Sequence, residues 1–216
     1  HAKHGQPRGS RLGKRGSGKR GHHDRARLGL PPRVDDGTTF ATDVFVVPAM
    51  GGVPKRLTWH PGIDLVRDFS PDGKLVLFAS QRNSFTNRYF QLYTVNVATG
   101  AEIQLPIPNA FWASYNADGS QIAYTTIPDR FDQWKNYRGG TMSRIWLYNV
   151  QTHAVTEIPK PTGGANDSKP VWRGSKVYFR SDRDGEFNLY SYDAATKAVQ
   201  ALTKFNEFPV LSLAAS

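Results

Sequence analysis

Residues 69–80 read FSPDGKLVLFAS, and residues 91–105 read QLYTVNVATGAEIQL. In each stretch a short turn signal containing glycine adjoins a run of β-branched, aromatic and leucine residues. Apolar and polar side chains alternate along residues 91–97, which is the period of a strand with one buried face. Together the two stretches predict short antiparallel strands joined by tight turns.

This pattern recurs along the chain. The aromatic residues Phe45, Tyr93, Tyr148 and Tyr190 hold equivalent places, at spacings of 48, 55 and 42 residues. A second unit has a turn signal at 114–119 and apolar runs at 122–125, 145–150 and 155–158. A third unit has corresponding segments at 171–174, 177–179, 188–192 and 199–202. The runs 43–48 and 54–58 resemble the second half of an earlier unit.

Four short strands in every 40–50 residues predict the blades of a β-propeller. Each small sheet has two apolar faces, so neighbouring sheets must stack to bury them. Long helices are excluded because the runs are short and Gly/Pro turns recur. The fold class predicted is therefore all-β, a partial propeller of about three and a half four-stranded blades. We place the half blade at about 37–60 and the blades at about 66–108, 111–160 and 168–205.

Propellers close with roughly four to eight blades, so we expect residues 34–216 to be part of a larger protein. An open ring leaves sheet edges unpaired. We therefore expect residues 37–216 to fold poorly by themselves.

Residues 1–33 form a basic tail. They hold ten of the 28 Lys and Arg residues, one of the 18 acidic residues and seven of the 20 glycines, with no aromatic residue. Such a segment cannot bury enough apolar area to fold, so we predict disorder. A nucleic-acid-binding tail, a tag remnant and out-of-frame translation all fit this composition. The last two are favoured, because no aromatic side chain is present to stack on bases and the tail stands where two inner strands are expected.

Residues 34–216 hold the other 18 Lys and Arg and 17 Asp and Glu, so the folded part is nearly neutral. Nucleic acid is not expected as its partner. No apolar run approaches the roughly 20 residues that span a bilayer, so no membrane span is predicted. The chain has no cysteine, which excludes disulfides and thiolate chemistry. This fits the cytoplasm, with the periplasm as the alternative.

One stretch resembles a known family. Residues 131–141 read FDQWKNYRGGT, and Arg144-Ile145-Trp146 follows. These residues are similar to the Trp-Lys-x-Tyr-Arg-Gly-Gly-Thr…Ile-Trp signature of tricorn-type serine proteases, within the TolB-like and WD-type propellers. The resemblance covers about residues 37–216, with further agreement at 55–58, 177–185 and 188–191.

The resemblance implies a place in the first, six-bladed propeller of such a protease. A second propeller, a PDZ domain and a serine-peptidase core follow in that family. The implied role is a non-catalytic segment contributing to peptide access and domain assembly. The implied partners are peptides or the downstream PDZ and peptidase domains of the same chain, and a homo-oligomer stays open. The alternative is a TolB-like binding module of the cell envelope with no catalytic activity.

The family's catalytic residues lie downstream of the matched region, so the resemblance gives no residue here a catalytic role. Family members also hold a peptide's C-terminus with basic propeller residues. The matching stretch, His60 to Arg67, has no arginine pair, so that role is not assigned to Arg67.

The insertion from Pro128 to Ser143 is the main candidate site. It lengthens the second unit and is both aromatic and cationic. Exposed, it could contact a peptide through cation–π contacts and carboxylate hydrogen bonds; buried, it would dock onto a neighbouring blade or domain. The docked interpretation is slightly favoured, and Gly139-Gly140 is interpreted as a pair needing positive φ. The candidate peptide or interface contacts are Phe131, Trp134, Lys135, Tyr137 and Arg138.

No catalytic residue, metal ligand or cofactor is predicted. The folded part has two histidines, His60 and His153, and nothing marks a nucleophile turn beside either. The run Asp182-Arg183-Asp184-Gly185 begins like a calcium loop, but position 12 is Asp193 rather than the closing glutamate. A tight turn is therefore the preferred interpretation.

Overall fold

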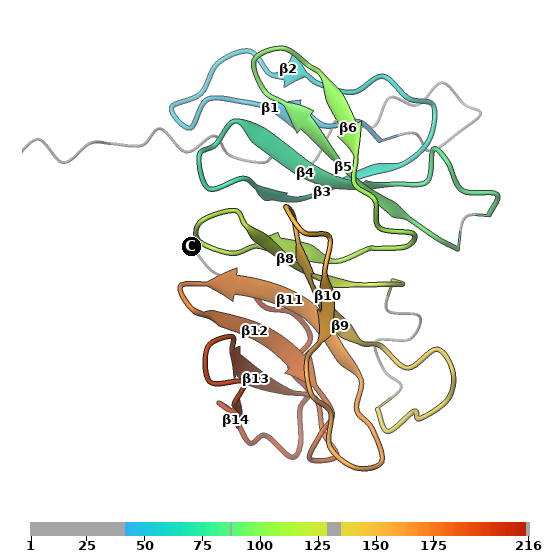
Figure 1. The fold of residues 1–216 in the computed structure, drawn as a ribbon, viewed down its shortest axis with the longest axis vertical. Helices are drawn as coiled ribbons and strands as arrows, with labels where there is room; N and C mark the ends of the chain where they lie inside the picture. Colours follow the sequence, from blue (N-terminus) through green and yellow to red (C-terminus); the bar gives the residue numbers. More distant parts are fainter. Residues whose placement is uncertain (1–41, 87, 129–134, 215–216) are drawn as a thin grey trace, which may run out of the picture.

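The computed structural model describes residues 42–86, 88–128 and 135–214. Within these ranges all regular structure is β-strand, arranged as three four-stranded sheets and one two-stranded sheet (Figure 1). The fold class predicted from the repeat, an all-β partial propeller, is confirmed. The basic tail lies outside the described residues, as do Phe131 and Trp134.

Each four-stranded sheet is an antiparallel meander in chain order. Blade 1 consists of β3 (Asp64–Phe69), β4 (Leu75–Ser80), β5 (Gln91–Asn96) and β6 (Glu102–Gln104). Blade 2 consists of β7 (Ala113–Tyr115), β8 (Gln121–Thr125), β9 (Ile145–Asn149) and β10 (Val155–Glu157). Blade 3 consists of β11 (Asp167–Arg173), β12 (Lys176–Ser181), β13 (Asn188–Asp193) and β14 (Val199–Ala201).

The half blade is shorter than its apolar runs suggest. It contains only β1 (Phe45–Val46) and β2 (Lys55–Arg56), paired antiparallel. A parallel bridge between Thr42 and Ile63 ties its start to the approach to β3.

Three apolar clusters hold the sheets face to face. Alternate residues of one strand serve different clusters, because successive side chains point to opposite faces of a sheet. On β8, Ile122 and Tyr124 pack toward blade 1, whereas Ala123 packs toward blade 3. This alternation is the stacking that the repeat predicts.

The first strand of each blade is the element that the sequence pattern places least well. Ser114 and Tyr115, interpreted above as part of a turn, belong to β7. They are buried although β7 is only three residues long. The strands β3 and β11 each contain a register shift, which interrupts the simple alternation of side chains.

Candidate functional site

The blades have two unlike ends. At the turn end, tight turns join the first and second strands of each blade, at residues 70–74, 116–120 and 174–175. At the loop end lie the connections between second and third strands, at 81–90, 126–144 and 182–187. In Figure 1 the β4–β5 connection and the segment leading into β9 extend to the right, while the β3–β4 and β11–β12 turns lie on the left. The described candidate site residues, Lys135, Tyr137 and Arg138, belong to the loop end.

Blade 1 carries a buried ion pair at its loop end. Arg82 Nη2 lies 2.6 Å from Oδ2 of Asp64, whose side chain is fully excluded from solvent. The guanidinium of Arg82 stacks over the rings of Phe78 and Tyr93, at 5.2 and 4.9 Å from their centroids. Arg82 also pairs with Glu102, so it connects all four strands of the blade.

Blade 3 repeats this arrangement. Arg183 Nη2 lies 2.6 Å from Oδ2 of the fully buried Asp167, and its guanidinium stacks over Phe179 and Tyr190. In both blades the aspartate faces the last residue of the second strand, Ser80 or Ser181, and the arginine follows that serine by two positions. We call this set of aspartate, arginine and two aromatic rings the clamp.

Blade 2 has none of the clamp residues at the corresponding positions, all of which are described. Thr125 takes the serine position and faces Trp112 rather than an aspartate. Ile127 stands at the arginine position. Ala123 and Leu147, which are paired across β8 and β9, replace the two rings. The insertion begins directly after these residues.

The described part of the insertion, residues 135–143, crosses from blade 2 to blade 3, and we call it the strap. Lys135 Nζ lies 2.6 Å from Oε2 of Glu186. The backbone amide of Asn136 donates to Oδ2 of Asp182 at 2.7 Å, and Arg138 Nη1 lies 2.9 Å from the same oxygen. Both carboxylates belong to the β12–β13 connection of blade 3.

Asp182 is the centre of this junction. Its side chain is fully buried, and Asn166 donates to it from both its backbone amide and its side-chain amide, at 2.7 and 2.8 Å. Burial by itself would raise the pKa of Asp182. The hydrogen bonds from Asn166, Arg138 and Asn136 outweigh burial and hold the pKa below its ordinary value, so the group is a carboxylate at neutral pH.

The end of the strap is fastened separately. The backbone amide of Asp167 donates to the carbonyl of Ser143, and the Ser143 hydroxyl donates to the carbonyl of Asp167. Lys160 Nζ donates to the carbonyls of Ser143 and Ala165 at 2.6 and 2.7 Å. Burial lowers the pKa of Lys160 to about 8, because two neutral carbonyls compensate an ammonium less well than water or a carboxylate does.

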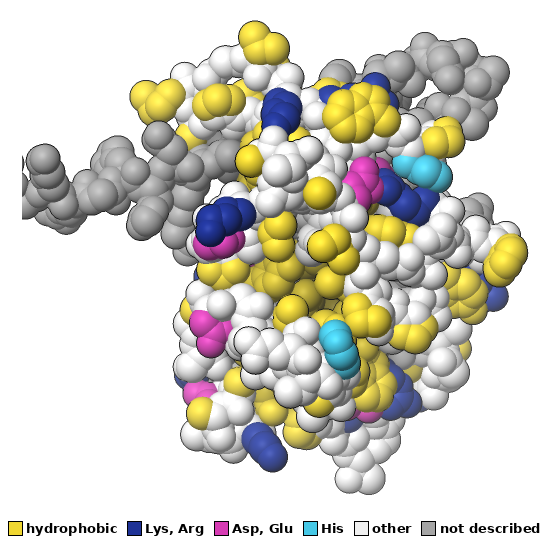
Figure 2. All heavy atoms as spheres, turned by 45° about the horizontal axis from the view of Figure 1, so that its top comes forward, with side chains coloured by type: hydrophobic (Ala, Val, Ile, Leu, Met, Phe, Trp, Pro, Cys, Tyr) yellow, Lys and Arg dark blue, Asp and Glu magenta, His cyan; other side chains and the backbone are white. Residues whose placement is uncertain are grey.

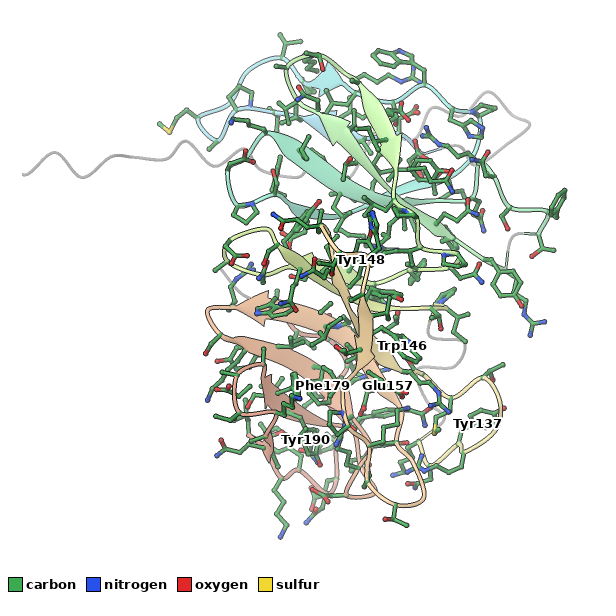
Figure 3. All side chains as sticks on the ribbon, in the orientation of Figure 1. Tyr137, Trp146, Tyr148, Glu157, Phe179 and Tyr190 are labelled. Atoms are coloured by element: carbon green, nitrogen blue, oxygen red, sulfur yellow. The ribbon has the colours of Figure 1, made fainter. Side chains whose placement is uncertain are left out.

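The strap brings together three of the five predicted site residues. Lys135 and Arg138 form ion pairs within the chain, with Glu186 and Asp182. Tyr137, which is labelled in Figure 3, accepts a hydrogen bond from Asn166 at its carbonyl and one from Thr141 at its hydroxyl. Their role as peptide or interface contacts stays a prediction.

The interpretation of Gly139-Gly140 was wrong. Neither residue has positive φ; the left-handed position in the strap is Asn136, with φ 63°. Gly139 is needed for a different reason. A Cβ atom there would meet the Tyr137 hydroxyl at 2.1 Å, so the ring folds back over the glycine.

Asp182, Asn166 and Glu186 are the site residues that sequence reasoning missed. The run 182–185 does form the predicted tight turn, with the Gly185 amide bonded to the Asp182 carbonyl and φ 95° at Gly185. Turn chemistry explains that backbone but does not indicate that the Asp182 side chain points inward. Its partners lie 16 to 46 residues away, so no local pattern connects them.

The two histidines lie at opposite ends of the blades. His60 Nδ1 accepts a hydrogen bond from the Gly62 amide, and His153, in the β9–β10 turn, bonds to the Tyr148 hydroxyl. Among the described residues, no three His, Asp or Glu side chains converge as metal ligands. None of the described segments forms a helix long and apolar enough to cross a membrane.

The surface charge agrees with the near balance in the sequence. Figure 2 shows Lys and Arg scattered singly over one face, with hydrophobic side chains gathered across its middle. The described residues on this face therefore form no basic patch of the kind that tracks a phosphate backbone.

Solved structures share this fold. The crystal structure of the tricorn protease aligns with a TM-score of 0.63 at 24% identity, over 85% of this chain and 18% of that one. A putative TolB from Agrobacterium tumefaciens aligns with a TM-score of 0.59 at 22% identity, over 79% and 58%. At these identities the likeness shows the fold alone.

Curated relatives are similar in sequence. The tricorn protease of Thermoplasma acidophilum is 28% identical over 184 residues, which is 82% of this chain and 17% of that protein. The putative tricorn protease homolog 2 of Streptomyces coelicolor is 29% identical over 185 residues, or 78% and 15%. This chain therefore spans about a sixth of their length. The family model for the tricorn protease N-terminal β-propeller domain matches residues 36–216. The chain belongs to the family of tricorn protease N-terminal β-propeller domains.

Proposed function

We propose that this chain is a non-catalytic propeller segment of a tricorn-like serine peptidase, contributing to peptide access and to domain assembly. The observation that carries the proposal is the placement of the motif shared with that family. Its described residues, 135–141, join two blades at the loop end, where the long connections gather. The described residues of this motif position a surface and supply neither a nucleophile nor a base. This fits a role in access or assembly.

Peptide access would use side chains that remain partly exposed at this end. The Lys135 side chain is 50% exposed despite its pair with Glu186, and Phe85 on the β4–β5 connection is fully exposed. Cationic and aromatic groups together suit the acidic and apolar side chains of a polypeptide.

Steady-state kinetics of the peptidase that contains this chain test the proposal. We expect Lys135→Met to raise KM for peptides several-fold with little change in kcat, because it removes binding energy common to ground and transition states. Lys74→Met is the matched control at the turn end and should leave both constants unchanged. Glu186→Gln removes the partner of Lys135 but keeps the charge of the lysine. It therefore separates the effect of losing the Lys135–Glu186 ion pair from the effect of losing the lysine itself. An unchanged KM in Lys135→Met contradicts the access role.

A further inference from the structure

We infer that the strap takes the place of the clamp in blade 2, so that the loop ends of blades 2 and 3 open as one cooperative unit while the loop end of blade 1 opens separately. The inference concerns how the chain holds itself together and does not depend on the proposed function.

The clamp closes the loop end of a blade from within. In blade 1, Arg82 connects Asp64 on β3 with Glu102 on β6 and covers the rings on β4 and β5. In blade 3, Arg183 connects Asp167 on β11 with the Pro159 carbonyl and covers the rings on β12 and β13. Each clamp belongs almost entirely to its own blade.

Blade 2 is closed from outside instead. Its second and third strands, β8 and β9, are the strands that the insertion connects. The strap ends at Ser143, two residues before β9, and Ser143 is bonded in both directions to the backbone of Asp167 on β11. The entry to β9 is therefore fixed by blade 3.

The strap and the clamp of blade 3 meet at adjacent residues. Asp182 receives the strap, and Arg183, the next residue, belongs to the clamp of blade 3. Asp167 likewise binds Arg183 through its side chain and Ser143 through its backbone. Loss of the strap anchor thus disturbs the closure of blade 2 and the loop end of blade 3 together, whereas no described strap contact reaches the clamp of blade 1.

The coupling has a consequence for the exposed surface. The charges of Lys135 and Arg138 are paired with Glu186 and Asp182 while the strap is docked. An acidic ligand must compete with these carboxylates, so binding of such a ligand to both cations would loosen blade 2.

Amide hydrogen exchange of the full chain tests the inference, with Asp182→Asn compared with Asp64→Asn. The substitutions are matched, because both carboxylates are fully buried and paired with an arginine. In both variants an amide of the same shape replaces the carboxylate, with one acceptor oxygen instead of two and no charge. We expect Asp182→Asn to speed exchange in β8, β9 and β12 by about tenfold or more, and Asp64→Asn to do so only in the strands of blade 1, β3 to β6.

Two outcomes overturn the inference. One is faster exchange in Asp182→Asn that is confined to residues 135–143, and the other is an equal effect of both variants on all three blades. If Asp182→Asn fails to fold, Arg138→Met removes one of the donors and should produce a smaller increase in the same strands. Unchanged exchange of β8 and β9 in that variant also overturns it.

Discussion

Three aspartate side chains, Asp64, Asp167 and Asp182, are fully excluded from solvent, and each is paired with an arginine. A buried carboxylate is costly unless it is paired and hydrogen-bonded, so removing one partner costs more than the pair contributes. At the residue scale these pairs are the points where single substitutions act most strongly.

Arg82→Met should lower the free energy of unfolding by about 3–5 kcal/mol, because Asp64 would keep a buried charge without its partner. Lys74→Met is the control: the Lys74–Asp72 pair is exposed and screened by solvent, so its loss should leave the free energy of unfolding almost unchanged. Urea unfolding of both variants makes the comparison. Equal destabilisation by the two substitutions would refute the view that burial gives the clamp its importance.

Lys160 gives the stability an unusual pH dependence. Burial lowers its pKa from 10.5 to about 8, so between these values the folded chain binds fewer protons than the unfolded chain. The contribution of Lys160 to the free energy of unfolding therefore rises with pH in this window and is lowest below pH 8. Lys160→Met should remove this rise, as measured by urea unfolding between about pH 7.5 and 9.5. The range ends there because Tyr115 and Tyr124, with pKa values raised to about 12, reverse the trend above pH 10. An identical slope in variant and parent would contradict the assignment.

At the scale of the elements, the turn between third and fourth strands repeats closely. Gly100, His153 and Lys197 occupy the same place in blades 1, 2 and 3, with φ of 73°, 58° and 59°. Each donates its amide to the residue four positions earlier. Only glycine adopts this conformation without steric cost.

Lys197→Gly should therefore stabilise the chain by about 0.5–1 kcal/mol, since it relieves the left-handed strain at an exposed position. Lys197→Ala keeps the Cβ atom and should bring no gain. Thermal unfolding of the two variants shows which holds, and equal midpoints would mean that backbone strain at this turn is negligible.

Some strands could be predicted from the sequence and others could not, for reasons that lie in their length and pattern. Strand 75–80 is a continuous apolar run and strand 91–96 alternates in polarity, and turn signals adjoin both, so their pattern is sufficient to locate them. Strand β7 has three buried residues and no alternation. The strap was recognised as an insertion, but its anchor, Asp182, is determined by contacts across 44 and 46 residues that no local period records.

At the scale of the whole molecule, the links that follow blades 1 and 3 take the same path but differ in burial. The amides of Leu105 and Ala110 bond to blade 1 as those of Leu202 and Val210 bond to blade 3. Leu105 and Ala110 are buried beneath blade 2. After blade 3, by contrast, Leu202, Phe205 and Phe208 are 43%, 53% and 77% exposed.

The open ring with its unpaired sheet edges led us to expect that residues 37–216 fold poorly by themselves, and this exposed apolar link adds a second physical reason. We predict concentration-dependent association in sedimentation or light scattering, reduced by Phe205→Ser with Phe208→Ser. Phe85→Ser is the control, because Phe85 is exposed on a loop away from the link. A monodisperse monomer with a cooperative thermal transition would contradict the expectation.

The proposal that needs testing first is that this propeller segment works within a serine peptidase and is not itself the catalyst. The most direct measurement captures the native polypeptide with an antibody against residues 42–214 and treats it with a fluorophosphonate, which modifies activated serine nucleophiles. We predict that the captured polypeptide is much longer than 216 residues and is labelled, while the purified 216-residue chain is not labelled. A captured polypeptide that does not react, or a purified chain that does, would contradict it.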